Sequence, residues 1–517
     1  MLKVENLQFR YPKESTFLLS DLHFEINDGE FLLVIGTSGS GKSTLLRCLK
    51  PELQPFGERT GKITYANESL EKLNSCDIGF VFQDPDDQMV MDKVWHELAF
   101  GLENMNMPVD QMKHRVAEIV QYFKLQEIYD CPVDQLSSGQ KQIVNLAAAM
   151  AMNPKILLLD EPTSRLDPFM AKQFLQFLKE IHDDFHTTII MVEHRFEEVL
   201  PLSQKILWLD QGKAAAFGVK EKVLEALIHQ EHPLHLALPE YMKLTKTALL
   251  TDKWTAHTYI QDHHWKVNPF LPLAKRGIFL QIKELNLEYD RHRVLKDLSF
   301  DLCEGEFFCL LGANGSGKST FLRHLAFAFG RKSSIYYKHT PIDKAMNKKI
   351  VLLPQNPQVL FAHDTVEEEL SGLERVEVID QWLKQFHLDG QRHQHPYDLS
   401  GGQQQLLALI KLLLLKPKLL LLDEPTNGID ASMKQVLGEI LTDLKQQGIT
   451  ILCVSHDLEF CAAFADRCGL LFDGKIEAVE ATREFFKNNL FYTTSLGRLF
   501  RWLNPRILLA KDVTEDE

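Results

Sequence analysis

The sequence predicts an α/β fold in which one type of domain occurs twice in tandem. The first observation is a glycine-rich loop of the form G-x-x-x-x-G-K-[ST], which occurs once in each half of the 517 residues. The second is the context of the loops, because each follows an apolar run of strand type and leads into helical sequence rich in Leu and Arg. The third is a set of further motifs that recurs in the same order in both halves. Together they predict two modules of one fold, produced by duplication and fusion.

The two glycine-rich loops follow apolar runs at 31–35 and 307–311, and we expect them to bind nucleoside triphosphates. Glycines let successive backbone N–H groups point at phosphate oxygens, and the helix N-terminus that follows adds positive potential. The two lysines supply a point charge, and the serines that follow them are predicted Mg²⁺ ligands. The loop residues predicted to bind nucleotide are Gly36, Thr37, Ser38, Gly39, Ser40, Gly41, Lys42, Ser43 and Thr44, and Gly312, Ala313, Asn314, Gly315, Ser316, Gly317, Lys318, Ser319 and Thr320.

Two further apolar runs end in a pair of carboxylates. Residues 156–159 lead into Asp160-Glu161, and residues 419–422 lead into Asp423-Glu424. Successive side chains at a strand end point apart. The Asp can therefore face Mg²⁺ while the Glu faces the attacking water as a general base. The alternative, in which the paired acids only cap the next helix, is disfavoured by the hydrophobic run and the phosphate loop together.

Each half also carries a glutamine and a histidine that fit a hydrolytic site. The glutamines can contact Mg²⁺ and water through their amides, and each histidine follows an apolar strand, at 187–192 or 450–454. At a strand's carboxyl end an imidazole N–H could hold a γ-phosphate oxygen. A lone histidine is more often structural, but its place in this motif order favours catalysis. The predicted catalytic residues are Gln83, Glu161 and His194, and Gln355, Glu424 and His456; the predicted Mg²⁺ ligands are Ser43, Gln83 and Asp160, and Ser319, Gln355 and Asp423.

The repeat sets the predicted domain organisation. We expect a first domain at 1–239, a linker at 240–277, a second domain at 278–490 and a tail at 491–517. An amphipathic helix is predicted over 219–229. The linker shows no helical or strand periodicity, and its histidines are spaced too irregularly for a metal site. The tail is interpreted as a surface helix with a frayed end.

Composition narrows the functional classes. The net charge is −14, from 71 acidic and 57 basic residues, which argues against sequence-independent nucleic-acid binding. The 8 cysteines form no C-x-x-C pair and are interpreted as reduced thiols. No uninterrupted apolar run reaches about 18 residues, and the start has no apolar signal region. Any membrane role must therefore come from partner chains.

Both halves resemble the ATP-binding cassette family almost end to end, through Leu399-Ser-Gly-Gly-Gln403 and its variant Leu136-Ser-Ser-Gly-Gln140. The resemblance implies that each half has a mixed sheet core with helices plus a helical signature subdomain. It also implies a head-to-tail cassette dimer, here intramolecular, with each ATP between one phosphate loop and the opposite signature. It adds Tyr11 and Tyr289 as residues that stack on adenine. The signature residues that it implies for nucleotide binding are Ser137, Ser138, Gly139 and Gln140, and Ser400, Gly401, Gly402 and Gln403.

Residues 82–89 and 9–12 resemble the ATPases of energy-coupling-factor (ECF) transporters, and the fused pair is most similar in organisation to hydroxymethylpyrimidine/thiamine importers. This implies an ATPase bound peripherally at the cytoplasmic face of the cell membrane, with ATP and Mg²⁺ as cofactors. Its implied partners are a transmembrane coupling protein and a small substrate-capture membrane protein, and no nucleic acid. The imported substrate would be a vitamin, a vitamin precursor or a transition-metal ion. Residues 83–91 and 355–361 are expected to face the membrane partner through exposed apolar clusters.

Two positions depart from the family pattern. Ser138 stands where the first signature glycine is expected, and the D-loop reads Ser164-Arg-Leu-Asp167 in the first copy against Asn427-Gly-Ile-Asp430 in the second. We therefore expect two competent but unequal sites. The alternative function is a soluble tandem-cassette ATPase acting on ribosomes or nucleic acid, but the linker lacks the long basic helix typical of such factors. A purely regulatory cassette is disfavoured because both predicted catalytic glutamates are present.

Overall fold

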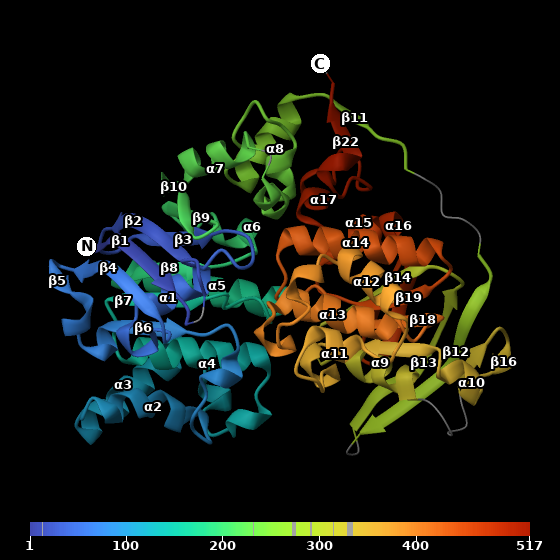
Figure 1. Cartoon of the computed structure of the whole chain (residues 1–517), viewed down its shortest axis with the longest axis horizontal. Coiled ribbons are helices and arrows are strands. Elements are labelled where there is room, and N and C mark those ends of the chain that lie inside the picture. Colours follow the sequence, from blue (N-terminus) through green and yellow to red (C-terminus); the bar gives the residue numbers. More distant parts are fainter. Residues whose placement is uncertain are drawn as a thin grey trace. The chain divides into compact units, whose positions relative to one another are not determined.

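The computed structural model describes residues 1–12, 14–230, 232–270, 276–289, 292–313, 315–327 and 334–516, with the backbone alone at 289 and 292. The chain divides into two compact units (Figure 1). The first comprises Met1–Pro239 and Lys246–Asp252, and the second Glu240–Thr245 and Lys253–Glu517. Each unit contains one of the two predicted phosphate loops.

A six-stranded sheet forms the centre of the first unit, in the order β10-β9-β3-β8-β7-β6. Neighbouring strands are parallel except for the edge strand β10. A second, antiparallel sheet has the order β2-β1-β4-β5. The strands are β1 Leu2–Arg10, β2 Leu19–Ile26, β3 Phe31–Ile35, β4 Glu58–Tyr65, β5 Glu68–Ser69, β6 Ile78–Val81, β7 Ile156–Asp160, β8 Thr188–Val192, β9 Lys205–Asp210 and β10 Lys213–Val219.

The central strands are continuous apolar runs because they are buried on both faces, as parallel strands covered by helices usually are. All five residues of β3, β7 and β8 are buried. The predicted amphipathic helix at the end of this unit is present as α7. The helices are α1 Lys42–Cys48, α2 Val94–Asn104, α3 Val109–Tyr122, α4 Ser138–Ala151, α5 Pro168–Phe185, α6 Phe196–Val199 and α7 Lys220–Ile228.

The second unit repeats this topology strand for strand. Its larger sheet has the order β21-β20-β14-β19-β18-β17, and its smaller one β13-β12-β15-β16. The strands are β12 Ile278–Tyr289, β13 His292–Cys303, β14 Phe307–Leu311, β15 Ile335–Tyr337, β16 Thr340–Pro341, β17 Ile350–Leu353, β18 Leu419–Asp423, β19 Thr450–Val454, β20 Arg467–Phe472 and β21 Lys475–Ala481. The helices are α9 Lys318–Phe327, α10 Lys344–Asn347, α11 Val366–Leu370, α12 Val376–Gln385, α13 Gly401–Leu413, α14 Ala431–Gln446, α15 Leu458–Phe464, α16 Thr482–Asn488 and α17 Ser495–Leu499. The predicted fold class and duplication are confirmed.

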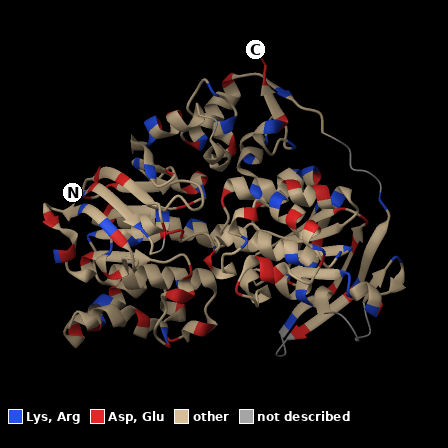
Figure 2. Ribbon diagram, in the orientation of Figure 1, with Lys and Arg blue, Asp and Glu red and all other residues tan. Residues whose placement is uncertain are grey.

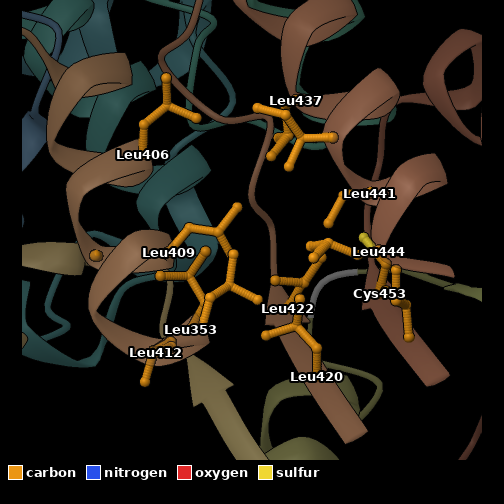
Figure 3. Packing of buried hydrophobic residues seen from close by; sticks show 14 of the residues in the cluster. Leu353, Leu406, Leu409, Leu412, Leu420, Leu422, Leu437, Leu441, Leu444 and Cys453 are labelled. Atoms are coloured by element: carbon orange, nitrogen blue, oxygen red, sulfur yellow. The ribbon is translucent and has the colours of Figure 1, made fainter. Parts of the chain in front are cut away.

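Leucines from helices and strands form the core that holds the carboxylate-bearing strand of the second unit. Figure 3 shows side chains of α13 and α14 together with those of β17, β18 and β19. Leu420 and Leu422 of β18 are fully buried in this cluster. Burying one such side chain contributes about 1.5–3 kcal/mol. The end of β18, where Asp423 and Glu424 emerge, is therefore held on a rigid base.

The expectation that residues 240–277 lack regular structure is wrong. They contain helix α8 (Lys253–Asp262) and strand β11 (Trp265–Val267). Strand β11 pairs antiparallel with β22 (Val513–Glu515) in the C-terminal tail. Periodicity could not reveal this sheet because each strand has only three residues and its partner lies far away in the sequence.

The interpretation of the tail as a frayed end is also wrong, because Asp512 anchors it. The Asp512 carboxylate is buried and accepts hydrogen bonds from the backbone N–H groups of Leu508 and Leu509, both at 2.9 Å. Arg483 of α16 donates to it through both terminal nitrogens. The N–H of Ala510 donates to Glu240 at 2.8 Å. Linker and tail are thus bound together within the second unit.

No helix among the described residues is long and apolar enough to cross a membrane. Figure 2 shows acidic and basic segments interspersed along the elements of both units. Helix α8, the helix found in the predicted linker, contains Lys253 and no other Lys or Arg. The long basic connector expected of a ribosome-associated factor is therefore not seen in the described part of the linker.

The Asp512 anchor leads to a stability prediction. Replacing Asp512 by Ala removes an acceptor of Arg483 and the acceptor of two backbone N–H groups, so we expect the free energy of unfolding of the second unit to fall by about 2–4 kcal/mol. Urea unfolding followed by intrinsic fluorescence would measure this. The matched control is Glu304→Ala, which breaks an exposed ion pair to Lys338 and should leave the transition unchanged. An unchanged transition for Asp512→Ala would contradict the anchor.

Candidate nucleotide-binding sites

The lysines of the two phosphate loops have the same contacts in both units. Lys42 Nζ donates to the carbonyl oxygens of Gly36 and Thr37, both at 2.9 Å. Lys318 Nζ donates to those of Gly312 and Ala313, again at 2.9 Å. Both lysines are buried. Each ammonium group is therefore held inside the turn of its own loop, where it can reach a bound phosphate.

Backbone geometry explains two glycines of each loop. Gly41 and Gly317, just before α1 and α9, have φ of 96° and 100°, in the left-handed region that favours glycine. A Cβ at Gly36 would lie 2.4 Å from the carbonyl oxygen of Leu209, and one at Gly312 would lie 2.4 Å from that of Leu471. Neither position can accept a larger residue without displacement of the adjacent strand. Residue 314 lies outside the described residues.

A buried hydroxyl in each loop supports an anion as the ligand. Among the described residues, Ser40 Oγ and Ser316 Oγ have no hydrogen-bond partner. Buried polar atoms nearly always have a hydrogen-bond partner, so two equivalent buried hydroxyls without one call for an explanation. A phosphate oxygen would supply the missing acceptor in both loops.

The next serine of each loop, a predicted Mg²⁺ ligand, contacts the aspartate of the carboxylate pair. Ser43 Oγ donates to Asp160 Oδ1, and Ser319 Oγ donates to Asp423 Oδ1, both at 2.9 Å. Burial, reinforced by the charge of Glu161, raises the pKa of Asp160 to about 6, against the opposing hydrogen bond from Ser43. Burial raises the pKa of Asp423 as well. Carboxylate and hydroxyl oxygens are hard ligands, so the Ser–Asp pair of each unit fits a cation such as Mg²⁺.

The first unit brings its three predicted catalytic residues together. His194 Nε2 lies 2.9 Å from Glu161 Oε1, and Gln83 Nε2 donates to Glu161 Oε2 at 2.9 Å. Glu161 has φ of 47°, a left-handed conformation that costs a non-glycine residue about 1–3 kcal/mol. Its N–H donates to the carbonyl of Val192 at 3.0 Å, which ties this strained residue to the strand that precedes His194.

The second unit brings only two of them together. His456 Nε2 lies 3.1 Å from Glu424 Oε1, and the N–H of His456 donates to Glu424 Oε2 at 3.1 Å. Glu424 has the same left-handed backbone, with φ of 51°. The side chain of Gln355, in contrast, is exposed and has no hydrogen-bond partner within the described part of the chain.

The signature segments begin helices. Ser137 and Ser400 are the N-caps of α4 and α13, and each forms a capping box with Gln140 or Gln403. A Cβ at Gly402 would lie 3.1 Å from Ile429, and one at Gly139 would lie 2.9 Å from Met170, so this second glycine serves packing inside its own unit.

The first signature glycine is different. A Cβ at Gly401 would meet its nearest neighbour, the carbonyl oxygen of Gly428, at 3.5 Å, which is an ordinary contact. The second unit would therefore accept a Cβ at this position without displacement of its backbone. Ser138, which stands here in the first unit, is half-buried.

The adenine-stacking residues are only partly accounted for. The hydroxyl of Tyr11 lies 3.2 Å from Thr44 Oγ1, which places this ring beside the first phosphate-loop helix. The side chain of Tyr289 lies outside the described residues. The stacking role stays a prediction for both.

Sequence reasoning missed Glu193. This carboxylate is 1% exposed and accepts hydrogen bonds from Thr163 Oγ1 at 2.6 Å and from the N–H of His194 at 2.8 Å. The second unit has Ser455 there, with its hydroxyl 3.3 Å from Thr426 Oγ1. A carboxylate directly after a fully buried strand needs a partner, and that signal was available in the sequence.

The expected apolar clusters after the glutamines are only partly exposed. Val90 and Val359 are 62% and 69% exposed, but Phe361 is 9% exposed and belongs to the core of the second unit. The expectation is therefore wrong for Phe361, and Leu360 packs against the same core. A short loop beside a helix buries whichever side chain faces the helix, which composition does not reveal.

Comparisons with known proteins place the chain in a family. The model of the ABC transporter family matches residues 19–164 and 295–427. The chain is 38% identical to a putative ABC transporter ATP-binding protein of Bacillus thuringiensis subsp. konkukian, over 99% of this chain and 98% of the relative. It is 32% identical to the putative HMP/thiamine import ATP-binding protein YkoD of Bacillus subtilis, over 92% and 91%.

Among solved structures, the archaeal ribosome recycling factor aABCE1 matches 93% of this chain and 91% of its own, with a TM-score of 0.61 and 20% identity. That likeness concerns the fold alone. The family model covers both predicted cassettes, and the relatives match across nearly the whole chain. The chain belongs to the ABC transporter family and is an ATPase with two ATP-binding cassettes.

Proposed function

We propose that this ATPase is the energy-coupling subunit of an ECF-type importer, bound at the cytoplasmic face of the cell membrane. It would drive uptake of a vitamin, a vitamin precursor or a transition-metal ion through a transmembrane coupling protein and a small substrate-capture membrane protein. The observation that carries the proposal is that each unit builds its own glutamate–histidine pair beside a phosphate loop. The name of YkoD supports import of a thiamine precursor by a relative of the same tandem organisation.

The hydrolytic chemistry follows from these contacts. The phosphate loop and its lysine bind the β- and γ-phosphates, and the glutamate accepts a proton from the attacking water. Mg²⁺, held by Ser43 and Asp160 with Gln83, or by Ser319 and Asp423 with Gln355, would neutralise charge on the phosphate oxygens. In the first unit the contacts from Gln83 and His194 hold the Glu161 carboxylate in one orientation. Such positioning is what a general base needs.

We further propose that the two cassettes form an intramolecular head-to-tail dimer, with domains at 1–239 and 278–490. Site one would combine the first unit's catalytic residues with Ser400, Gly401 and Gly402. Site two would combine the second unit's residues with Ser137, Ser138 and Gly139. A Cβ at the equivalent Gly401 would make only an ordinary contact in its own unit, so we expect the hydroxyl and Cβ of Ser138 to act where the backbone would approach the γ-phosphate.

The first functional prediction concerns the general bases. Replacing Glu161 and Glu424 together by Gln keeps side-chain shape and removes the base, so turnover should fall by roughly 10²-fold or more while ATP binding persists. Phosphate release measures turnover, and binding of a fluorescent nucleotide measures ATP affinity. The control is Glu127→Gln with Glu477→Gln, two exposed residues outside the sites. Full turnover in the Glu161/Glu424 variant would refute the assignment.

The second functional prediction concerns the difference in turnover between the two proposed sites. Glu161→Gln should lower turnover more than Glu424→Gln, because Glu161 faces the intact signature in the proposed dimer. The expected difference is about fivefold in rate, equivalent to about 1 kcal/mol. Steady-state hydrolysis by the two single variants measures it. Equal losses of turnover in the two variants, or a larger loss from Glu424→Gln, would show that Ser138 does not affect hydrolysis.

The third functional prediction concerns docking to the proposed membrane partner. Val90 and Val359 are the exposed apolar residues that follow the two glutamines, so Val90→Asp with Val359→Asp should release the chain from its membrane complex without loss of ATP binding. Co-purification from detergent-solubilised membranes measures this. Val219→Asp, at a residue that is 52% exposed before α7, is the control. Retention of the complex by the double variant would reject the docking surface.

A further inference from the structure

An ion pair joins the D-loop of the first unit to the loop that carries Gln83. Arg165 Nη1 lies 2.6 Å from Asp84 Oδ2. The Arg165 side chain is 48% exposed and that of Asp84 is 24% exposed, so the pair is only partly screened by water. Asp84 follows Gln83 directly and also caps the short helix η4 (Pro85–Asp87) by accepting from the N–H of Asp86 at 3.1 Å.

The backbone on the Arg165 side is fixed from three directions. Ser164 Oγ donates to the carbonyl of Glu161 at 2.9 Å, and Arg195 Nη2 donates to the carbonyl of Leu166 at 3.1 Å. Asp167 then caps α5. The guanidinium of Arg165 therefore extends from an anchored turn, and it restrains Asp84 rather than the reverse.

The second unit provides an internal comparison. The equivalents of Asp84 and Arg165 are Asn356 and Gly428, which cannot form an ion pair. Asn356 still caps its short helix η9 (Pro357–Leu360), accepting from the N–H of Gln358 at 3.0 Å. The cap is thus common to both units, whereas the bridge occurs in the first alone. The glutamine contacts the catalytic glutamate only in the unit with the bridge, since Gln83 bonds Glu161 at 2.9 Å and the Gln355 side chain is exposed.

We infer that Arg165 is a positioning residue for ATP hydrolysis in the first cassette, acting through Asp84 to hold Gln83 on Glu161. The inference rests on the proposed role of Glu161. Without the bridge, the loop is free to move so that Gln83 leaves the carboxylate, as Gln355 does in the second unit. A general base that loses one of its two orienting contacts spends less time in the reactive geometry. ATP binding depends on the phosphate loop and should not change.

The test is a double-mutant cycle in a Glu424→Gln background, so that turnover reports mainly the first cassette. The single changes are Arg165→Gly and Asp84→Asn, which install the residues of the second unit and keep the cap of η4. Each should lower kcat about 3- to 5-fold and leave KM unchanged, as expected for a partly exposed ion pair. The double variant should lose no more than either single one, because both changes remove the same interaction.

Two further variants separate positioning from general stability. Arg165→Lys retains the positive charge and should keep at least half of the turnover. Lys179→Ala breaks an exposed ion pair to Asp183 on α5 and should leave kcat unchanged. Raising the salt concentration should bring the kcat of the parent towards that of Arg165→Gly, because the ion pair is screened.

The outcomes are distinguishable. An unchanged kcat in Arg165→Gly, or losses from the two single changes that add up in the double variant, would overturn the inference. A changed KM with unchanged kcat would show a role in binding and would overturn it as well. Failure of the proposed function would appear separately, as full turnover when Glu161→Gln is introduced into the same background.

Discussion

Parallel pairing of three buried strands determines where the chemistry can occur in each unit. Strands β7, β8 and β3 are neighbours in the first sheet, and β18, β19 and β14 in the second. Their carboxyl ends carry the carboxylate pair, the histidine and the phosphate loop in that order. Residues from three distant parts of the sequence therefore meet at one sheet edge, as ligand sites in α/β folds do. A hydrogen bond of 2.9 Å from the loop serine to the strand aspartate joins the phosphate loop to the carboxylate-bearing strand in both units.

The same constraint explains why the two glutamates proposed as general bases are strained. Glu161 and Glu424 leave their strands with left-handed backbones, and the N–H of each is held by the carbonyl of the neighbouring strand. The buried leucines below β18 keep that strand from relaxing. The stability of the core thus offsets a conformational cost of about 1–3 kcal/mol at the proposed general base.

The central strands and the motifs at their ends could be predicted from the sequence, because local apolar runs indicate buried strands and motif residues mark the loops that follow them. The strands at 31–35, 307–311 and 450–454 were predicted with their final bounds, and motif order named the serines, aspartates, glutamates and histidines that the structure brings together. The β11–β22 pairing, the buried anchor of Asp512 and the Arg165–Asp84 bridge were not predicted. Strand β11 pairs with a strand far away in the sequence, and Arg483–Asp512 and Arg165–Asp84 are single side-chain contacts, so no periodicity records any of them. The different placement of Gln83 and Gln355 escaped prediction for the same reason, since the two motifs match each other in sequence.

We propose that one chain builds two nucleotide sites, each with its own phosphate loop, carboxylate pair and histidine. The most direct measurement is the number of ATP molecules bound per chain with Mg²⁺ present, by equilibrium dialysis of the full-length chain in which both glutamates are replaced by Gln. We expect two bound ATP molecules, and Lys42→Ala and Lys318→Ala should each remove one, because each lysine lies inside its own loop. A single bound ATP in the parent, or loss of both on changing one lysine, would contradict it.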